Sequence, residues 1–258
     1  MQYPNKRNFN NKAWRFAPLS LLCFAAFNLG AQPAAVPAIR VILVGDSTMA
    51  TRTGYGDALC QRFTAQVECI NLAKGGRSTL SYRAEGLWEL ALQRMRPGAK
   101  PQTTYVFVQF GHNDQPGKPG RSTDLQTEYP VNLERYVQDI RAEAAIPVLV
   151  TPLTRRSFDG DRLQTTLQPW ADAMASVAGR LQVPLVDLHA YSVRAVQAMG
   201  QEEADTLAMP PPPPGDTTTK NPFDLTHLGA KGANYFAGLV VPVIAQAVPA
   251  LRPHLRAD

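Results

Sequence analysis

Short apolar segments alternate with longer segments of helical periodicity from residue 40 onwards. Five segments are rich in apolar and β-branched residues and are bounded by Gly, Pro or polar residues, which is typical of strands. They are residues 40–44, 68–72, 104–110, 147–151 and 185–188. The apolar residues between them recur at the spacing of helices that pack on one face. These helical segments are residues 56–63, 85–95, 132–144 and 170–181.

The predicted strands are nearly continuous apolar runs, as in RVILV at 40–44 and TYVFVQF at 104–110. Strands of this kind are buried on both faces, and strands that alternate with helices form parallel sheets with helices on both sides. The chain is therefore expected to fold as a single doubly wound α/β domain of three layers. Its 258 residues are enough to enclose a large core.

A last helix is expected to begin near Gly229, with Pro242 kinking or ending it. Its apolar face should pack against the sheet, and consists of Tyr235, Phe236, Leu239 and Val240. Five consecutive prolines at 210–214 follow a helix expected to end near Met199. They are interpreted as part of an extended surface loop and not as a domain boundary.

The chain carries 26 Lys and Arg against 21 Asp and Glu, a formal net charge of +5. Four of the basic residues lie within residues 1–31, which contain no acidic residue. Removing those four from the 26 leaves 22 basic against 21 acidic side chains. So balanced a composition gives no electrostatic basis for binding nucleic acid.

The N-terminal charges precede an apolar run at 19–31, which is followed by the small residues QPAAVPA. This layout is typical of a secretory signal peptide. A membrane anchor is the competing interpretation, but it needs about 20 apolar residues and this run has about 13. We therefore predict a signal peptide at 1–31 and one domain at 32–258, in an exported protein with no membrane span in the mature chain.

Cys23 lies in the predicted leader, so the mature chain keeps only Cys60 and Cys69. In an exported protein, this pair is compatible with one disulfide or with two separately buried thiols. The chain contains neither CxxC nor HExxH, and no metal site is predicted.

Polar residues follow three of the predicted strands directly. They form the segments GDSTM at 45–49, AKGGRS at 73–78 and GHND at 111–114. A fourth segment, DLTH at 224–227, precedes the last predicted helix. Ligands of an open parallel sheet bind beyond the carboxyl ends of its strands, so the first three segments should face one crevice.

The four segments contain a candidate for each role in acyl transfer, which requires a nucleophile, a base, a group that orients the base, and oxyanion donors. Ser47 is the candidate nucleophile, His227 the base and Asp224 the orienting acid. The candidate oxyanion donors are the backbone N–H groups of Ser47 and Gly76 and the side-chain amide of Asn113. An α/β-hydrolase is disfavoured, because its GxSxG elbow would need a glycine at position 49.

Each candidate also has a purely structural interpretation. Ser47 is a favoured residue for capping the following helix, and Asp224 for stabilising the N-terminus of the last one. Asn113 and the Gly75–Gly76 pair could simply form turns, in which Asn and Gly are common. Asp46 is expected to hydrogen-bond the backbone around the turn of Ser47. His112 and Asp114 are interpreted as structural or substrate-contacting residues and not as metal ligands.

Together, the four segments resemble the Ser, Gly, Asn and His blocks after which the SGNH, or GDSL-type, hydrolases are named. Within that superfamily the chain is most similar to rhamnogalacturonan acetylesterases and related pectin acetylesterases. The resemblance also includes residues 128–156 and the extension of the fourth segment to DLTHLGAKGA. It implies a flavodoxin-like fold with a five-stranded parallel sheet, no cofactor, and removal of acetyl groups from pectic polysaccharide.

The chain departs from this pattern in two places. The first segment reads GDST where the family name has GDSL, and residues 200–221 resemble an individual insertion. The partner implied by the resemblance is an acetylated polysaccharide, whose galacturonate units carry carboxylates. Arg77 is the candidate to bind such a carboxylate, whereas Arg52 and Lys74 are interpreted as solvated surface charges.

Two other functions compete with this one. A lipase, thioesterase or general carboxylesterase would use the same catalytic residues on a different ester. A non-catalytic carbohydrate-binding protein would be expected to lack a member of the Ser47, Asp224 and His227 set, and none is missing. The sequence makes no prediction of the oligomeric state.

Overall fold

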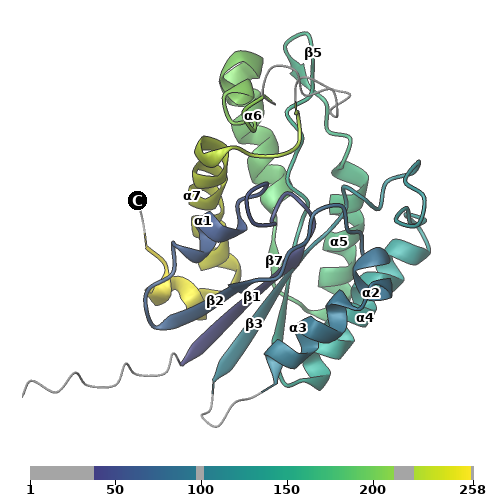
Figure 1. Ribbon diagram of the computed structural model, residues 1–258, viewed down its shortest axis with the longest axis vertical. Helices are drawn as coiled ribbons and strands as arrows, with labels where there is room; N and C mark the ends of the chain where they lie inside the picture. Colours follow the sequence, from purple (N-terminus) through teal and green to yellow (C-terminus); the bar gives the residue numbers. More distant parts are fainter. Residues whose placement is uncertain (1–37, 97–101, 212–223, 257–258) are drawn as a thin grey trace, which may run out of the picture. The chain divides into compact units, whose positions relative to one another are not determined.

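The computed structural model describes residues 38–96, 102–211 and 224–256 (Figure 1). The predicted leader at 1–31 and three of the five consecutive prolines, 212–214, lie outside the described residues.

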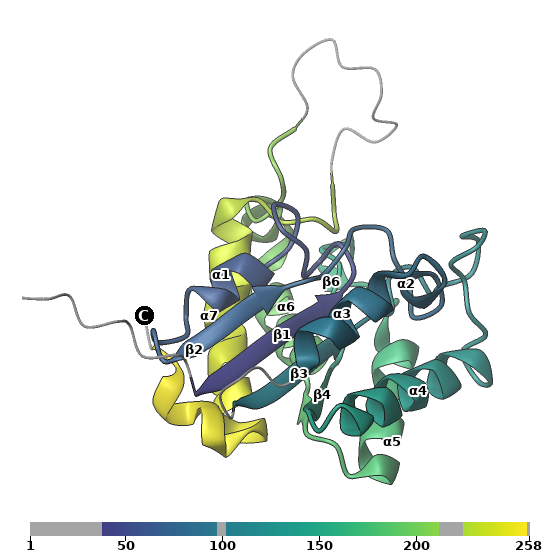
Figure 2. The ribbon, with the colours of Figure 1, turned by 60° about the horizontal axis from the view of Figure 1, so that its bottom comes forward.

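A parallel sheet of five strands forms the centre of the fold (Figure 2). Its strands are β1 (Ile39–Gly45), β2 (Val67–Asn71), β3 (Thr103–Gln109), β4 (Ile146–Val150) and β7 (Leu185–Val186). The order β2-β1-β3-β4-β7 confirms the predicted doubly wound topology, and the five predicted strands match the observed ones to within about two residues. The order reverses between β1 and β3, where Gly45 pairs with Gln109 at the carboxyl ends.

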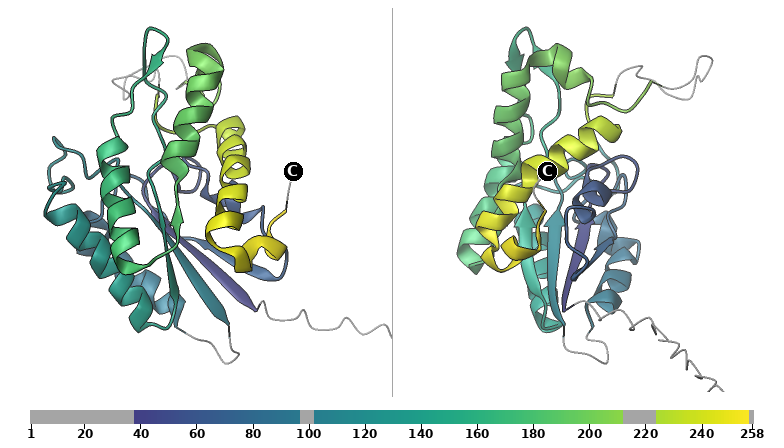
Figure 3. Two further views of the ribbon diagram at one scale, coloured as in Figure 1. Left: turned by 180° about the vertical axis from the view of Figure 1, so that it is seen from behind. Right: turned by 90° about the vertical axis from the view of Figure 1, so that its left-hand side faces the viewer.

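Helices cover both faces of the sheet, which completes the three layers (Figure 3). One face carries α1 (Gly56–Cys60), α6 (Leu188–Asp205), α7 (Ala230–Ala247) and the 3₁₀ helix Pro249–His254. The other carries α3 (Leu87–Met95), α4 (Glu128–Ala142) and α5 (Gln168–Leu181). The short helix α2 (Ser81–Ala84) and a hairpin of β5 (Phe158–Asp159) and β6 (Arg162–Leu163) were not predicted.

Successive side chains of each strand point to opposite faces of the sheet, so each strand contributes to the core on both faces. In β1, Val41 and Leu43 pack toward α1, α6 and α7, while Ile42 and Val44 pack toward α3, α4 and α5. All four side chains are fully buried. Burying one such side chain stabilises the fold by about 1.5 to 3 kcal/mol, which explains why strands buried on both sides are apolar throughout.

The last helix begins at Ala230, next to the predicted Gly229. Of the two outcomes expected at Pro242, a kink or an end, the end is excluded, because the helix continues to Ala247. Beyond the proline, Val243 and Ile244 are buried in the core, and their burial opposes the cost of about 3 kcal/mol for an internal proline. Phe236 and Val240 are buried as predicted, but Tyr235 is 39% exposed and lies off the packed face.

Two further features concern Gly200 and the cysteines. The helix predicted to end near Met199 is interrupted there by Gly200, which has φ of 74°, and then continues to Asp205. Cys60 and Cys69 form a disulfide that ties the end of α1 to β2. The structure thus decides between the two alternatives that the sequence left open for this pair.

Candidate active site

The three strand-end segments lie at the carboxyl edge of the sheet, as predicted. Residues 46–49 follow β1, residues 73–78 follow β2, and residues 111–114 follow β3. The pairing of β1 with β3 continues one residue beyond the end of β1, since the Asp46 N–H donates to the Gln109 carbonyl at 3.3 Å.

Ser47 lies in a turn that Asp46 organises. The Asp46 carboxylate is fully buried, and its Oδ1 accepts from the backbone N–H of Thr48 at 2.9 Å and from the Thr48 hydroxyl at 2.8 Å. The next helix begins only at Gly56 and has no side-chain cap, so the helix-capping interpretation of Ser47 is wrong. Among the described residues, the Ser47 hydroxyl has no hydrogen-bond partner, and it does not bond directly to His227.

Two buried acids hold the turn and its neighbouring loop. Asp46 Oδ2 lies 3.3 Å from His112 Nδ1. Burial would raise the pKa of Asp46, but His112 and the Thr48 donors outweigh it and lower that pKa. Burial lowers the pKa of His112, so the imidazole is neutral near pH 7. Burial also raises the pKa of Asp114 to about 7, although its carboxyl accepts from the backbone and hydroxyl of Thr79.

The Thr79–Asp114 contact joins the loop after β2, residues 73–79, to the loop after β3 that carries Asn113. A second contact does the same, since Asn113 Nδ2 donates to the Arg77 carbonyl at 3.0 Å. Gly76 has φ of +78°, a conformation that favours glycine. In the part of the chain that the structure describes, the N–H groups of Ser47 and Gly76 have no hydrogen-bond partner. Both remain available to an incoming oxygen.

Asp224 and His227 form a hydrogen-bonded pair. His227 Nδ1 lies 2.7 Å from Asp224 Oδ2, while Asp224 Oδ1 accepts from the N–H groups of Thr226 and His227 at 2.9 and 2.8 Å. Partial burial would raise the pKa of Asp224, but these hydrogen bonds hold it well below its usual range. The helix α7 starts later, at Ala230, so Asp224 closes the local turn and does not cap that helix.

Thr53, which the sequence analysis did not single out, connects this pair to the turn of Ser47. Its hydroxyl donates to the Ser47 carbonyl at 2.7 Å, and its carbonyl accepts from the Leu228 N–H at 2.9 Å. One residue therefore bridges the turn that carries Ser47 and the residue that follows His227.

Arg156 is a second residue missed by the sequence analysis. Its side chain is fully buried, and Nη2 donates to the carbonyls of Asp224 at 2.5 Å and His227 at 2.9 Å. Its own N–H donates to the Leu225 carbonyl at 2.9 Å. Arg156 lies six residues beyond the end of β4, so the rule that located polar residues directly after the strands does not extend to it.

Arg77 is engaged within the protein. Its Nε and Nη2 bond Glu85 Oε2 at 2.8 and 2.6 Å, and its Nη1 donates to the Gly75 carbonyl at 2.7 Å. The substrate-binding role of Arg77 stays a prediction. Arg52 and Lys74 are exposed, in agreement with their interpretation as surface charges.

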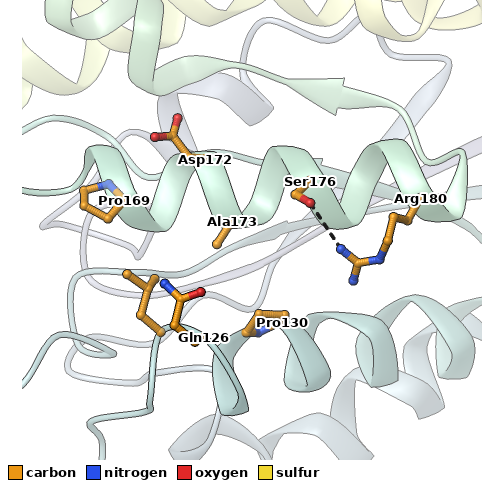
Figure 4. Close-up of a pocket in the computed structure, with 8 residues that line it drawn as sticks. Gln126, Pro130, Pro169, Asp172, Ala173, Ser176 and Arg180 are labelled. Atoms are coloured by element: carbon orange, nitrogen blue, oxygen red, sulfur yellow. Dashed lines mark hydrogen bonds between the residues drawn. The ribbon is translucent and has the colours of Figure 1, made fainter.

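The described ranges, 38–96, 102–211 and 224–256, offer little to other kinds of site. They contain no group of three or more His, Cys, Asp or Glu side chains that would hold a metal ion, and no helix long and apolar enough to cross a bilayer. A depression of about 480 Å³ lies between α4 and α5, where Ser176 accepts a hydrogen bond from Arg180 (Figure 4). None of the predicted site residues lines it.

Two relatives of this chain are rhamnogalacturonan acetylesterases. The chain is 35% identical over 232 residues to rhamnogalacturonan acetylesterase RhgT of Bacillus subtilis (strain 168), covering 84% of this chain and 94% of that protein. It is 29% identical to the rhamnogalacturonan acetylesterase of Emericella nidulans, with 83% and 87% covered.

Two solved structures share the fold. A mutant of the acetyl-xylooligosaccharide esterase Axe2 from Geobacillus stearothermophilus superposes with a TM-score of 0.57 at 17% identity, covering 80% of this chain and 93% of that one. Protein YxiM of Bacillus subtilis gives 0.65 at 23% identity, with 82% and 57% covered. Because residues 43–234 also match the model of the GDSL-like Lipase/Acylhydrolase family, the chain belongs to that family and is a carboxylic ester hydrolase.

Proposed function

We propose that this protein is an exported serine esterase that removes acetyl groups from pectic polysaccharide, with rhamnogalacturonan as its substrate. The observation that carries the proposal is the hydrogen bond between Asp224 and His227. Thr53 links the segment of this pair to the turn of Ser47, because it bonds both the Ser47 carbonyl and the Leu228 N–H. The substrate is supported by the names of relatives at 35% and 29% identity.

In the proposed mechanism, Ser47 Oγ attacks the acetyl carbonyl carbon while His227 Nε2 takes the hydroxyl proton. Asp224 holds the Nδ1–H of the imidazole and stabilises its positive charge. The developing oxyanion accepts hydrogen bonds from the N–H groups of Ser47 and Gly76 and from Asn113. His227 then protonates the departing sugar oxygen. A water molecule, deprotonated by His227, hydrolyses the acetyl-enzyme and releases acetate.

The direct bond between Ser47 and His227 would form when substrate binds, since catalytic hydrogen bonds are often long in free enzymes. Export rests on the leader pattern at 1–31, and the single-domain assignment of 32–258 is supported by the one central sheet around which the described helices pack.

Asn113→Ala is expected to lower kcat by about a hundred- to a thousandfold, because one oxyanion donor is lost. The Asn113 amide has two N–H groups, and only one is used by the Arg77 carbonyl. The KM for 4-nitrophenyl acetate should change little. Asn234→Ala, an exposed position on α7, serves as the control. A change confined to KM would make Asn113 a residue of ground-state binding.

Arg156→Ala is expected to lower kcat by about a hundredfold, because the turn of Asp224 and His227 loses its buried donors and the imidazole moves. Millimolar guanidinium should restore part of that rate by occupying the vacated site, and Arg156→Lys should keep more activity than Arg156→Ala. Thermal unfolding monitors the fold. A loss that guanidinium does not reverse would mean that Arg156 supports folding only.

The proposed function is tested by two measurements. The first is acetate release from acetylated rhamnogalacturonan, homogalacturonan and xylan, and the second is hydrolysis of 4-nitrophenyl esters of increasing acyl chain length. The highest kcat/KM is expected on rhamnogalacturonan, with a steep decline from acetyl to longer acyl chains. Preference for xylan would contradict the pectic substrate, and preference for long acyl chains would favour the lipase alternative.

A further inference from the structure

Three cationic side chains lie beside the two loops of the candidate active site that carry Gly76 and Asn113. Lys118 Nζ donates to the His112 carbonyl at 2.7 Å and lies 3.5 Å from Asn113 Oδ1. Arg121 Nη1 donates to the Gly76 carbonyl at 3.3 Å. Both residues therefore touch the loops that carry the proposed oxyanion donors.

Arg155 is the third cation of this cluster. It directly precedes Arg156, which holds the turn of Asp224 and His227, and its Nη1 donates to the Thr166 hydroxyl at 3.1 Å. Thr166 also accepts from Gln115 Nε2 through its carbonyl at 3.0 Å, which places Arg155 beside the loop that carries Asn113 and Lys118. The charge of Arg155 lowers the pKa of both His112 and Lys118. The cluster Lys118, Arg121 and Arg155 thus extends from the Gly76 loop toward the segment after β4.

None of the three forms an ion pair within the described residues, where their hydrogen-bond partners are neutral oxygens. Arg77 by contrast is paired with Glu85. The two acids whose charges raise the pKa of Lys118, Asp46 and Asp114, are buried and accept hydrogen bonds from Thr48 and Thr79. Burial, followed by the charges of Arg155 and Arg121, lowers the pKa of Lys118.

Like charges gathered in this way repel one another, and an anion placed among them removes that repulsion. Guanidinium groups recognise carboxylates in particular, through two parallel hydrogen bonds. A polysaccharide with a carboxylate on a sugar near the acetylated one would supply such an anion while its ester lies at Ser47.

We propose that Lys118, Arg121 and Arg155 form a carboxylate-binding subsite that selects acetylated uronic-acid polysaccharides over neutral ones. This inference rests on the proposed function and adds the residues that determine its substrate class. The galacturonate carboxylate is bound by Arg121 and Arg155, and Lys118 contributes its charge.

The test compares acetate release from acetylated rhamnogalacturonan oligosaccharides with release from the same oligosaccharides after methyl-esterification of their carboxylates. In the wild type, kcat/KM should be higher on the charged substrate, and 0.5 M salt should reduce the difference by screening. Arg121→Gln and Arg155→Gln should each lower the charged-to-neutral ratio by about tenfold, mainly through KM.

Arg155→Lys, which keeps the charge but not the fork of donors, should retain part of the preference. Arg94→Gln is the control, because Arg94 is exposed and lies by Arg40 in β1, toward the amino ends of the strands. Equal losses on both substrates, or no change in the ratio, would overturn the subsite.

A second readout separates this inference from the proposed function. Oligogalacturonate should inhibit hydrolysis of 4-nitrophenyl acetate, with a Ki raised about tenfold in the Gln variants, whereas xylo-oligosaccharides should not inhibit. If inhibition depends on these arginines but rhamnogalacturonan releases no acetate, the subsite stands and the proposed function falls. If oligogalacturonate does not inhibit, the subsite is overturned.

Discussion

Ser47→Ala is expected to lower kcat for 4-nitrophenyl acetate by about a millionfold, the scale seen when a serine protease loses its nucleophile. In the proposed mechanism, the variant removes the oxygen that attacks the ester, and His227 then has no hydroxyl to activate. A residual rate above that in water should survive, because the N–H groups of Ser47 and Gly76 still stabilise the oxyanion.

The fold should tolerate this change. The turn is held by Asp46 and by the Ser47 carbonyl, which accepts from Thr53, and alanine at position 47 keeps that carbonyl. Ser176→Ala, on the exposed side of α5, should retain full activity and serves as the matched control. Circular dichroism and thermal unfolding should match the wild type. A folded Ser47→Ala protein with near-normal turnover would disprove the serine mechanism.

Asp224→Asn is expected to lower kcat by about ten thousandfold, as the equivalent change does in serine proteases. The asparagine Oδ1 can still accept from the Thr226 and His227 N–H groups, so the turn is kept. The NH₂ group, however, replaces the oxygen that faces His227 Nδ1. Two donors cannot bond to each other, so the imidazole must carry its proton on Nε2, where it cannot accept the Ser47 proton.

Proton NMR gives a direct readout of this tautomer. The wild type should show a downfield Nδ1–H resonance from the Asp224–His227 bond, and Asp224→Asn should lack it. Asp172→Asn, exposed on α5, is the control. Retention of both the resonance and most of the activity in Asp224→Asn would remove Asp224 from the mechanism.

The hydrophobic pattern by itself determined the layers and the strands. Val41 to Val44 are apolar without interruption because each faces a helix layer, so local sequence is sufficient to identify a strand buried on both sides. The pattern also located three of the candidate segments, since polar residues that directly follow such strands must lie at one edge of a parallel sheet.

Local rules failed where burial opposed them. A proline predicts a helix end, yet α7 continues through Pro242 because the residues beyond it are buried in the core. The state of Cys60 and Cys69 was equally undetermined, because a disulfide requires proximity in space that spacing along the chain does not give.

The contacts that hold the candidate site together were decided only by the tertiary structure. Arg156 bonds carbonyls 68 and 71 residues away, and Arg121 reaches the Gly76 carbonyl across 45 residues. Hydrogen bonds to backbone carbonyls leave no residue-type signature at the accepting position, because every residue carries the same C=O group. The sequence therefore identified the residues proposed for the chemistry. The residues that position them, such as Arg156, and the cations beside them, such as Arg121, were identified only from contacts that the folded loops make.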